Sequence, residues 1–322
     1  MAKYDYTYIE LVEKILEDGV MDNSEFVRGR YEDGQPAPAI SLPNQQIKID
    51  SEKEVPRLST KFVPEKDPFK ELRWIWQLMS NDVTVLQEMG CKVWDEWKRP
   101  DSTIGKAYGW QLKNKKRTII MDELFVQMFR NNEFSIRMKD TEEEWSESDY
   151  DALLQEIKDG SEHAIKLNQV DYLLYQLKKN PYSRQIKTTL WCVEDLDDMA
   201  LPPCVYETHW FMFDGRLNLT VNIRSNDIAL GNPYNVYQYF LLHHMIAQVS
   251  NLKVGELCFN LDIPHIYDRH IDSLKEQIKK PVHDEPNLYI NKDITSFYDF
   301  TIDDIKVLNY EHSGKIKYEV AI

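Results

Sequence analysis

The segment from residue 205 to residue 249 constrains the fold most. Residues 205–213 and 216–224 predict two antiparallel strands joined at Asp214-Gly215, a dipeptide that favours the tight turn of a hairpin. In the second strand apolar residues alternate with polar ones, which is typical of a strand with one buried face. After Pro233, the run NVYQYFLLHHMIAQVS is apolar on every side and predicts a buried helix. With eight Trp and 18 Tyr, the chain is not expected to be disordered.

Three further helices are indicated by the spacing of apolar residues. Residues 4–18 predict an amphipathic helix, residues 68–80 a mostly buried one, and residues 169–179 a helix with one apolar face. Residues 28–65 contain Gly, Pro and short polar/apolar alternations, so they are expected to form loops and strands.

Residues 112–165 differ in character from the rest of the chain. They include the acidic stretch DTEEEWSESDYDALLQEIKDGSE, in which one short helix is expected around Leu153, Leu154 and Ile157. We expect a single catalytic domain over residues 1–322 in which this region is a surface insertion, a solvated charged face without chemistry of its own.

Composition excludes several classes of function. The net charge of −15 disfavours a general nucleic-acid binder, although an anionic small ligand is compatible with it if arginines gather locally. The four cysteines have no CxxC spacing, which argues against zinc and redox motifs and favours free thiols in a reducing compartment. His243-His244 lacks the i, i+4 spacing of metal ligands, so no metal is expected.

No targeting or membrane signal is visible. The N-terminus lacks the apolar core of a signal peptide, and no apolar run approaches the length that crosses a bilayer. The expected location is the cytoplasm, or the host cytoplasm if the chain is phage-encoded.

The sequence around Cys204 indicates a catalytic residue. This cysteine lies in ALPPCVYET, directly before a predicted strand. A single cysteine is more often a small buried apolar residue than a nucleophile. The loop RSNDIALGNPYN (224–235) favours the nucleophile over the buried apolar residue, because an arginine beside a thiol favours the thiolate. A Ser/Arg pair and a helix N-terminus also suit a phosphate, although an ordinary turn with a helix cap would leave the same pattern.

Six motifs in this order resemble the thymidylate synthase family. They are WDEW (94–97), AYG (107–109), LPPC (201–204), RSND-x-x-LG-x-P-x-N (224–235), HIY (265–267) and the terminal VAI (320–322). The resemblance covers most of the chain outside residues 112–165. Val205 after the cysteine, followed by YET, and SNDIALGNPYN resemble the A-type synthases of Bacillus, whereas most of the family has His after the cysteine.

The resemblance implies an α/β fold with a large twisted mixed sheet covered by helices, assembled as a homodimer. It implies one-carbon transfer from 5,10-methylenetetrahydrofolate to C5 of dUMP, giving dTMP and dihydrofolate. C5 of uracil is a poor nucleophile, and addition of the Cys204 thiolate at C6 would convert the ring to an enolate that reacts at C5. Glu71 resembles the carboxylate that organises water for proton transfer, and Tyr108 the tyrosine near C5 proton removal.

The same resemblance implies residues for both ligands. Asn235 would read N3–H and O4 of uracil, since an amide offers one donor and one acceptor. The other nucleotide contacts would be Arg28, Arg224 and Ser225 on the phosphate, Arg184 on the phosphate from the partner subunit, and His265 and Tyr267 on the ribose. The folate contacts would be Trp94, Asp227, Leu230, Gly231, Tyr234 and Ile322. Taken alone, Trp94, Leu230 and Tyr234 are equally typical of core residues.

Three departures from the family pattern leave the product open. Gln185 stands where a second arginine is usual, His209 where a glutamine is usual, and Asp262-Ile263 where Gly-Asp is usual. They fit a second function, a dUMP hydroxymethylase that releases 5-hydroxymethyl-dUMP and tetrahydrofolate. A third hypothesis is an inactive regulator that binds nucleotide or RNA. The retained Cys204 and Glu71 argue against this regulator.

Overall fold

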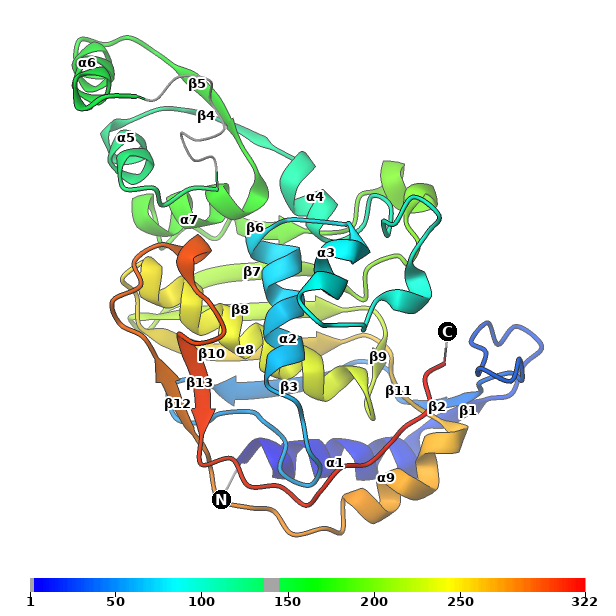
Figure 1. Cartoon of the computed structure of the whole chain (residues 1–322). Coiled ribbons are helices and arrows are strands. Elements are labelled where there is room, and N and C mark those ends of the chain that lie inside the picture. The colour runs from blue at the N-terminus through cyan, green and yellow to red at the C-terminus, as the bar shows by residue number, and fades with distance from the viewer. Residues whose placement is uncertain (1–2, 136–144, 322) are drawn as a thin grey trace.

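The computed structural model describes residues 3–135 and 145–321, and its centre is a five-stranded sheet (Figure 1). The strand order is β3 (Gln45–Asp50), β10 (Val254–Leu261), β8 (Arg216–Ile223), β7 (Val205–Phe213) and β6 (Ile186–Thr189). β10 and β8 are parallel, and the other three pairs are antiparallel. The predicted mixed sheet and its hairpin are therefore confirmed.

Helix α8 (Gly231–Val249) packs against β8, β10 and α2 (Lys66–Leu72). The alternating residues Leu217, Leu219 and Val221 of β8 are fully buried. The start of α8 is earlier than predicted, because Pro233 lies in its first turn rather than before it. Proline is tolerated there, since the first N–H groups of a helix have no intrahelical partner. The predicted helix at 68–80 is α2 continued by a π-helical turn, Arg73–Gln77.

A second, four-stranded sheet brings distant parts of the chain together. Its order is β1 (Val20–Asp22), β2 (Ala39–Ser41), β11 (Pro264–Tyr267) and β9 (Asn226–Asp227). β11 and β9 are parallel, with His265 opposite Asp227. The predicted N-terminal helix is α1 (Lys3–Asp18), which packs against β2 and β3 and runs along the lower edge of the molecule in Figure 1.

Most elements of the acidic region form one end of the molecule (Figure 1). They are β4 (Arg117–Ile120), α5 (Glu123–Arg130), α6 (Glu147–Lys158) and β5 (Ala164–Leu167), whereas α4 (Gly109–Asn114) packs against the π-helical turn Arg73–Gln77. Phe125, Phe129 and Phe134 are buried there, and the Phe125 ring stacks on each of the other two. The region is therefore not only the solvated charged face that its composition suggested. Part of the acidic run lies outside the described residues.

The remaining elements complete the core. They are α7 (Gln169–Lys179), whose ends agree with the prediction, α3 (Val83–Glu88), α9 (Ile271–Gln277), β12 (Asn287–Ile290), β13 (Ile305–Leu308) and the short 3-10 helices Asp95–Trp97, Val193–Asp198, Asp268–His270 and Phe297–Asp299. No helix in the described ranges combines the length and apolarity needed to cross a membrane.

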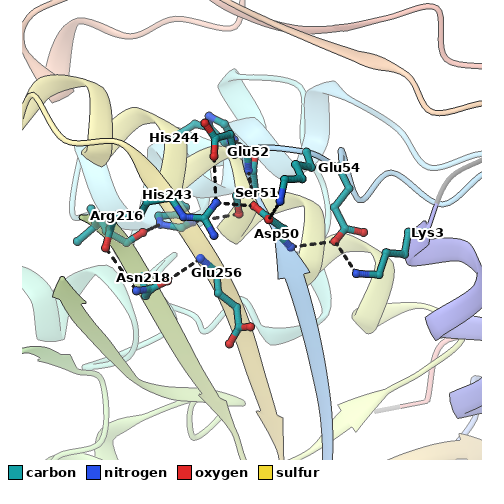
Figure 2. A network of polar contacts seen from close by, with 12 residues as sticks. Lys3, Asp50, Ser51, Glu52, Glu54, Arg216, Asn218, His243, His244 and Glu256 are labelled. Atoms are coloured by element: carbon teal, nitrogen blue, oxygen red, sulfur yellow. Dashed lines mark hydrogen bonds and ion pairs between the residues drawn. The ribbon is translucent and has the colours of Figure 1, made fainter. Parts of the chain in front are cut away.

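The histidine pair of α8 has a structural role. The His243 ring lies 3.1 Å from the Ser51 hydroxyl and 2.8 Å from the Leu217 carbonyl, and the His244 ring lies 2.9 Å from the Ser51 carbonyl. Figure 2 shows both rings beside the end of β3. Burial lowers the pKa of His243 to about 4 and that of His244 to about 3, so both are neutral at pH 7. Within the described residues, no group of three or more His, Cys, Asp or Glu side chains is arranged to hold a metal.

Candidate active site

Cys204 is held by its backbone at the start of β7. Its N–H lies 3.0 Å from the Tyr108 hydroxyl oxygen, to which it donates, and its carbonyl accepts from the N–H of Arg224 at 2.9 Å. The Arg224 guanidinium donates to the carbonyls of Pro203 at 2.9 Å and Pro202 at 2.6 Å. The two prolines and Arg224 therefore fix the direction from which the chain presents the thiol.

Two opposing effects set the pKa of this thiol. Burial raises the pKa of Cys204 above its ordinary value, while the nearby Arg224 and a hydrogen bond with Tyr108 oppose the rise. The prediction that Arg224 favours the thiolate agrees with the direction of its effect. Burial has the larger effect, because an ionised sulfur that is removed from water loses more solvation energy than the arginine supplies. The thiol is therefore protonated at neutral pH in the ligand-free protein.

A line of side chains connects Cys204 to a buried carboxyl. Trp94 contacts the Tyr108 ring edge to face, with centroids 4.9 Å apart, and donates from Nε1 to Glu71 Oε1 at 2.6 Å. Glu71 Oε2 accepts from Gln238 at 2.9 Å. Burial raises the pKa of Glu71, with the two hydrogen bonds opposing it. A carboxyl with a raised pKa can hold and release a proton near neutral pH, as a general acid or base requires.

The backbone at Tyr108 is strained. This residue has φ +47°, in the region that side-chain-bearing residues rarely adopt. The next residue, Gly109, packs so tightly that a Cβ would lie 2.3 Å from the Ser80 carbonyl oxygen. Strain of this kind persists where surrounding packing enforces it. The AYG motif therefore needs its glycine because the backbone at Gly109 lies close to Ser80. The backbone conformation at Tyr108 directs the hydroxyl of this residue toward Cys204.

The loop from 224 to 235 lies beside this line. Asp227 Oδ1 accepts from the N–H groups of Ala229 at 2.8 Å and Leu230 at 3.2 Å, and Oδ2 has no hydrogen-bond partner among the described residues. Leu230, Tyr234 and Asn235 are half-buried near the start of α8. A Cβ on Gly231 would lie 3.8 Å from the nearest atoms, so a side chain here would cause no steric clash. The glycine therefore leaves open space at this point of the loop.

The predicted ribose contacts lie on β11, next to the N-terminal loop. His265 is buried and its ring lies 5.0 Å from that of Tyr267, both measured between centroids. A Cβ on Gly29 would lie 3.8 Å from Tyr267, so the loop that carries Arg28 passes beside β11. Burial raises the pKa of Tyr267 to about 12, which keeps its hydroxyl neutral.

Two of the side chains predicted to bind phosphate are exposed and form no polar contact with the rest of the described chain. Among the described residues, neither the Arg28 nor the Arg184 guanidinium has a hydrogen-bond or ion-pair partner. Arg28 lies in the loop before β2, whereas Arg184 lies just before the sheet-edge strand β6. Ser225 is half-buried next to Arg224. The structure thus brings Arg224 beside the cysteine backbone, and among the described residues no contact joins Arg184 to Arg224 or Cys204.

Two of the three departures make local contacts. Gln185 is exposed, and the His209 ring lies 3.1 Å from the Arg184 carbonyl. Ile263 is 49% exposed, but its carbonyl accepts from the Asn226 N–H at 3.1 Å and lies 3.2 Å from the His265 ring. The Asp262-Ile263 pair therefore shapes the turn into β11.

Sequence reasoning missed the residues that hold the C-terminal tail. Lys61 is buried beneath the Tyr318 ring, donates to the Ala229 carbonyl, and has its pKa lowered by burial to about 8. The Arg269 guanidinium pairs with Glu319 at 3.0 Å and with Asp33 at 2.8 Å. The sequence around Lys61, RLSTKFV, is mixed polar and apolar and gave no signal of this burial. Ile322, predicted to close the site, lies outside the described residues.

The chain is similar to known proteins over its whole length. Residues 6–322 match the family model described as thymidylate synthase. Thymidylate synthase of Bacillus licheniformis is 45% identical and thymidylate synthase 1 of Bacillus subtilis is 43% identical, with 100% of both chains covered in each case. Thymidylate synthase of Bacillus phage phi3T is also 43% identical at the same coverage. The solved structure of thermostable thymidylate synthase A from Bacillus subtilis superposes with a TM-score of 0.82 at 42% identity, covering 100% of both chains.

Proposed function

The chain belongs to the thymidylate synthase family, and on that basis we propose that it transfers a one-carbon unit from 5,10-methylenetetrahydrofolate to C5 of dUMP, forming dTMP and dihydrofolate. The observation that carries the proposal is the line Cys204–Tyr108–Trp94–Glu71. It combines a held thiol, a neutral phenol and a carboxyl with a raised pKa. A regulator without catalysis has no need of this combination.

Cys204 acts as the nucleophile. The Cys204 thiol gives up its proton to water, the resulting thiolate forms a bond to C6 of uracil, and the electron pair of the C5–C6 double bond moves onto O4 as an enolate. C5 then forms a bond to the methylene carbon of the folate as one of that carbon's two bonds to nitrogen breaks, and the second carbon–nitrogen bond breaks when the C5 proton leaves, so that tetrahydrofolate is the leaving group. Water held by Glu71 and Tyr108 takes the C5 proton. Elimination of the Cys204 thiolate from C6 restores the ring double bond in the final step.

The folate supplies the methylene carbon and then a hydride, which reduces that carbon to a methyl group. The residues present fit such a molecule. Trp94, Leu230 and Tyr234 offer apolar surface, and Asp227 Oδ2 is available to accept N–H groups of a pterin ring. Because the pKa of Tyr234 is raised by burial, its ring stays neutral beside them.

The proposed nucleotide contacts are those that the family resemblance implies. Arg28, Arg224 and Ser225 bind the phosphate, and His265 and Tyr267 bind the ribose hydroxyl. Arg184 reaches the phosphate of a second subunit in a homodimer. Its unpaired guanidinium at the sheet edge supports this arrangement, since a cation free in one chain is available to another. The same sheet carries a hydrogen-bonded row of half-buried polar residues, Asn260, Asn222 and Glu207, which is available for a symmetric contact.

The product distinguishes the two activities on this scaffold, and the relatives named above favour the synthase. We expect dTMP and dihydrofolate in equal amounts, because the C-terminal tail excludes water from the exocyclic methylene. Deleting Ile322 should divert part of the flux to 5-hydroxymethyl-dUMP. Mass spectrometry of the nucleotide and absorbance of dihydrofolate measure both. A wild-type product one oxygen atom heavier than dTMP, released with tetrahydrofolate, would replace the synthase by the hydroxymethylase.

Asn235 should set the choice of base. We expect Asn235→Asp to shift the preference between dUMP and dCMP by roughly tenfold or more toward dCMP. A protonated carboxyl accepts from the cytosine amino group and donates to N3, whereas an ionised one repels uracil O4. Competition binding with the two nucleotides measures the shift. An unchanged preference would mean that another residue reads the base.

We also propose that the protein works in the cytoplasm, and that residues 112–165 are a surface insertion in a single catalytic domain. The thiol chemistry supports the first, since Cys91, Cys192, Cys204 and Cys258 are all free.

A further inference from the structure

Asn235 lies at the end of a buried chain of hydrogen bonds that begins in the N-terminal helix. The Tyr4 hydroxyl of α1 donates to Asn232 Oδ1 at 3.0 Å, and Asn232 Nδ2 donates to Asn226 Oδ1 at 2.7 Å. Asn226 Nδ2 then donates to Asn235 Oδ1 at 3.3 Å. We call Tyr4, Asn232 and Asn226 the amide relay.

The relay is shielded from water. Tyr4 and Asn226 are 2% exposed and Asn232 is 0% exposed. Buried amides must place donors against acceptors, because an unpaired buried polar group costs about 1–3 kcal/mol. Reversing any one of these amides would therefore set two donors or two acceptors against each other.

The backbone around the relay is fixed as well. The Asn226 N–H donates to the Ile263 carbonyl at 3.1 Å, and Asn226 pairs with Pro264 across β9 and β11. Tyr8, one helical turn beyond Tyr4, donates to the Ile228 carbonyl at 2.9 Å. Helix α1 thus contacts the first turn of α8 through Tyr4 and the loop before α8 through Tyr8, and both contacts hold the relay in place.

We propose that the amide relay determines base specificity by fixing which way the Asn235 amide faces. With Oδ1 turned to Asn226, Nδ2 is directed away as a donor, and the second lone pair of Oδ1 is left to accept. That arrangement matches O4 and N3–H of uracil. The reversed amide would match the amino group and N3 of cytosine. Asn226, Asn232 and Tyr4 are positioning residues, since they act through Asn235, and the inference rests on the proposed binding of dUMP.

Aspartate substitutions test the direction of the relay. A carboxylate introduced by Asn226→Asp still accepts from Asn232 but has nothing to donate to Asn235. The Asn235 amide should then reverse so that its Nδ2 donates to the new carboxylate. We expect dUMP to bind roughly tenfold more weakly and dCMP to bind more tightly than to the wild type. Asn232→Asp should also weaken dUMP binding and strengthen dCMP binding, because it acts through Asn226. Tyr4→Phe should reduce the preference for dUMP over dCMP without inverting it.

The matched control is Asn218→Asp. Asn218 is 7% exposed, lies on β8 in the network of Figure 2, and uses Oδ1 to accept from the Glu256 N–H at 2.6 Å, a contact that a carboxylate keeps. Its nucleotide preference should equal that of the wild type.

The measurement is calorimetric binding of dUMP and dCMP to the full chain without folate, with thermal unfolding to verify the fold of each variant. An inverted or narrowed preference in folded Asn226→Asp supports the relay. An unchanged preference, or an equal loss of both nucleotides, overturns it. If the wild type itself binds neither nucleotide, the proposed function fails instead, and the two failures are therefore distinguishable.

Discussion

Cys204→Ser is expected to lower turnover by roughly a thousandfold or more while dUMP still binds. A serine hydroxyl is almost wholly protonated at neutral pH, so addition at C6 of uracil loses its nucleophile. The fold should be retained, because the contacts of Cys204 with Tyr108 and Arg224 run through its backbone N–H and carbonyl. Steady-state kinetics and calorimetric titration with dUMP measure the two properties separately.

The matched control is Cys192→Ser, since Cys192 is also a free, half-buried thiol and belongs to none of the proposed machinery. Its turnover should stay within about twofold of the wild type, as for surface substitutions generally. Turnover of Cys204→Ser within tenfold of the wild type would remove this residue from the mechanism.

The reactivity of Cys204 should also depend on pH in a defined direction. Since burial raises the pKa of this thiol, the thiolate fraction is small at pH 7 and grows as the pH rises toward that pKa. Alkylation of Cys204 in the ligand-free protein should therefore accelerate with pH. Bound dUMP should protect the thiol. A rate that is flat from pH 6 to 8 would instead indicate a thiolate already formed.

The elements that the sequence predicted best are those with a strong local signal. Helix α7 has a clear apolar period and an N-cap, Asn168, whose side chain accepts from the Asp171 N–H. The hairpin of β7 and β8 has both an alternating strand and an Asp214-Gly215 turn, in which Gly215 has φ +70°. The start of α8 was predicted wrongly, because proline marks a boundary in sequence but is accepted in a first turn.

The residues of the candidate site could be predicted from sequence motifs, but their pKa values could not. LPPC and RSND identify Cys204 and Arg224, and the structure places them together. The raised pKa of Cys204 depends on how completely the fold excludes water, which no local motif reports. The amide relay was invisible for a related reason, since Tyr4 and Asn232 are 228 residues apart and meet only in the folded chain.

Lys61 illustrates the same limit. In sequence it follows Thr60 in a loop and resembles a surface lysine. In the fold it lies between the Tyr318 ring and the Ala229 carbonyl, beside the loop that carries Asp227. Burial explains its lowered pKa, and burial is decided by the tail packing over it.

Mixing two inactive variants should restore activity if the homodimer shares its phosphate sites. In a dimer of one Cys204→Ser chain and one Arg184→Glu chain, the chain with the intact cysteine receives the intact arginine of its partner. The other site of that dimer lacks both. Random exchange of equal amounts makes half of the dimers mixed, so activity should reach about a quarter of the wild-type value.

Arg224 provides the control for this experiment, because it acts within its own chain. Its guanidinium holds the carbonyls of Pro202 and Pro203 beside the cysteine of the same subunit. Mixing Cys204→Ser with Arg224→Gln therefore leaves every site defective, and activity should not recover. Sedimentation and native mass spectrometry verify that subunits have exchanged. A monomer in solution, or verified exchange without recovery in the Arg184 mixture, would show that each chain binds phosphate alone, with Arg184 exposed for some purpose other than the partner's nucleotide.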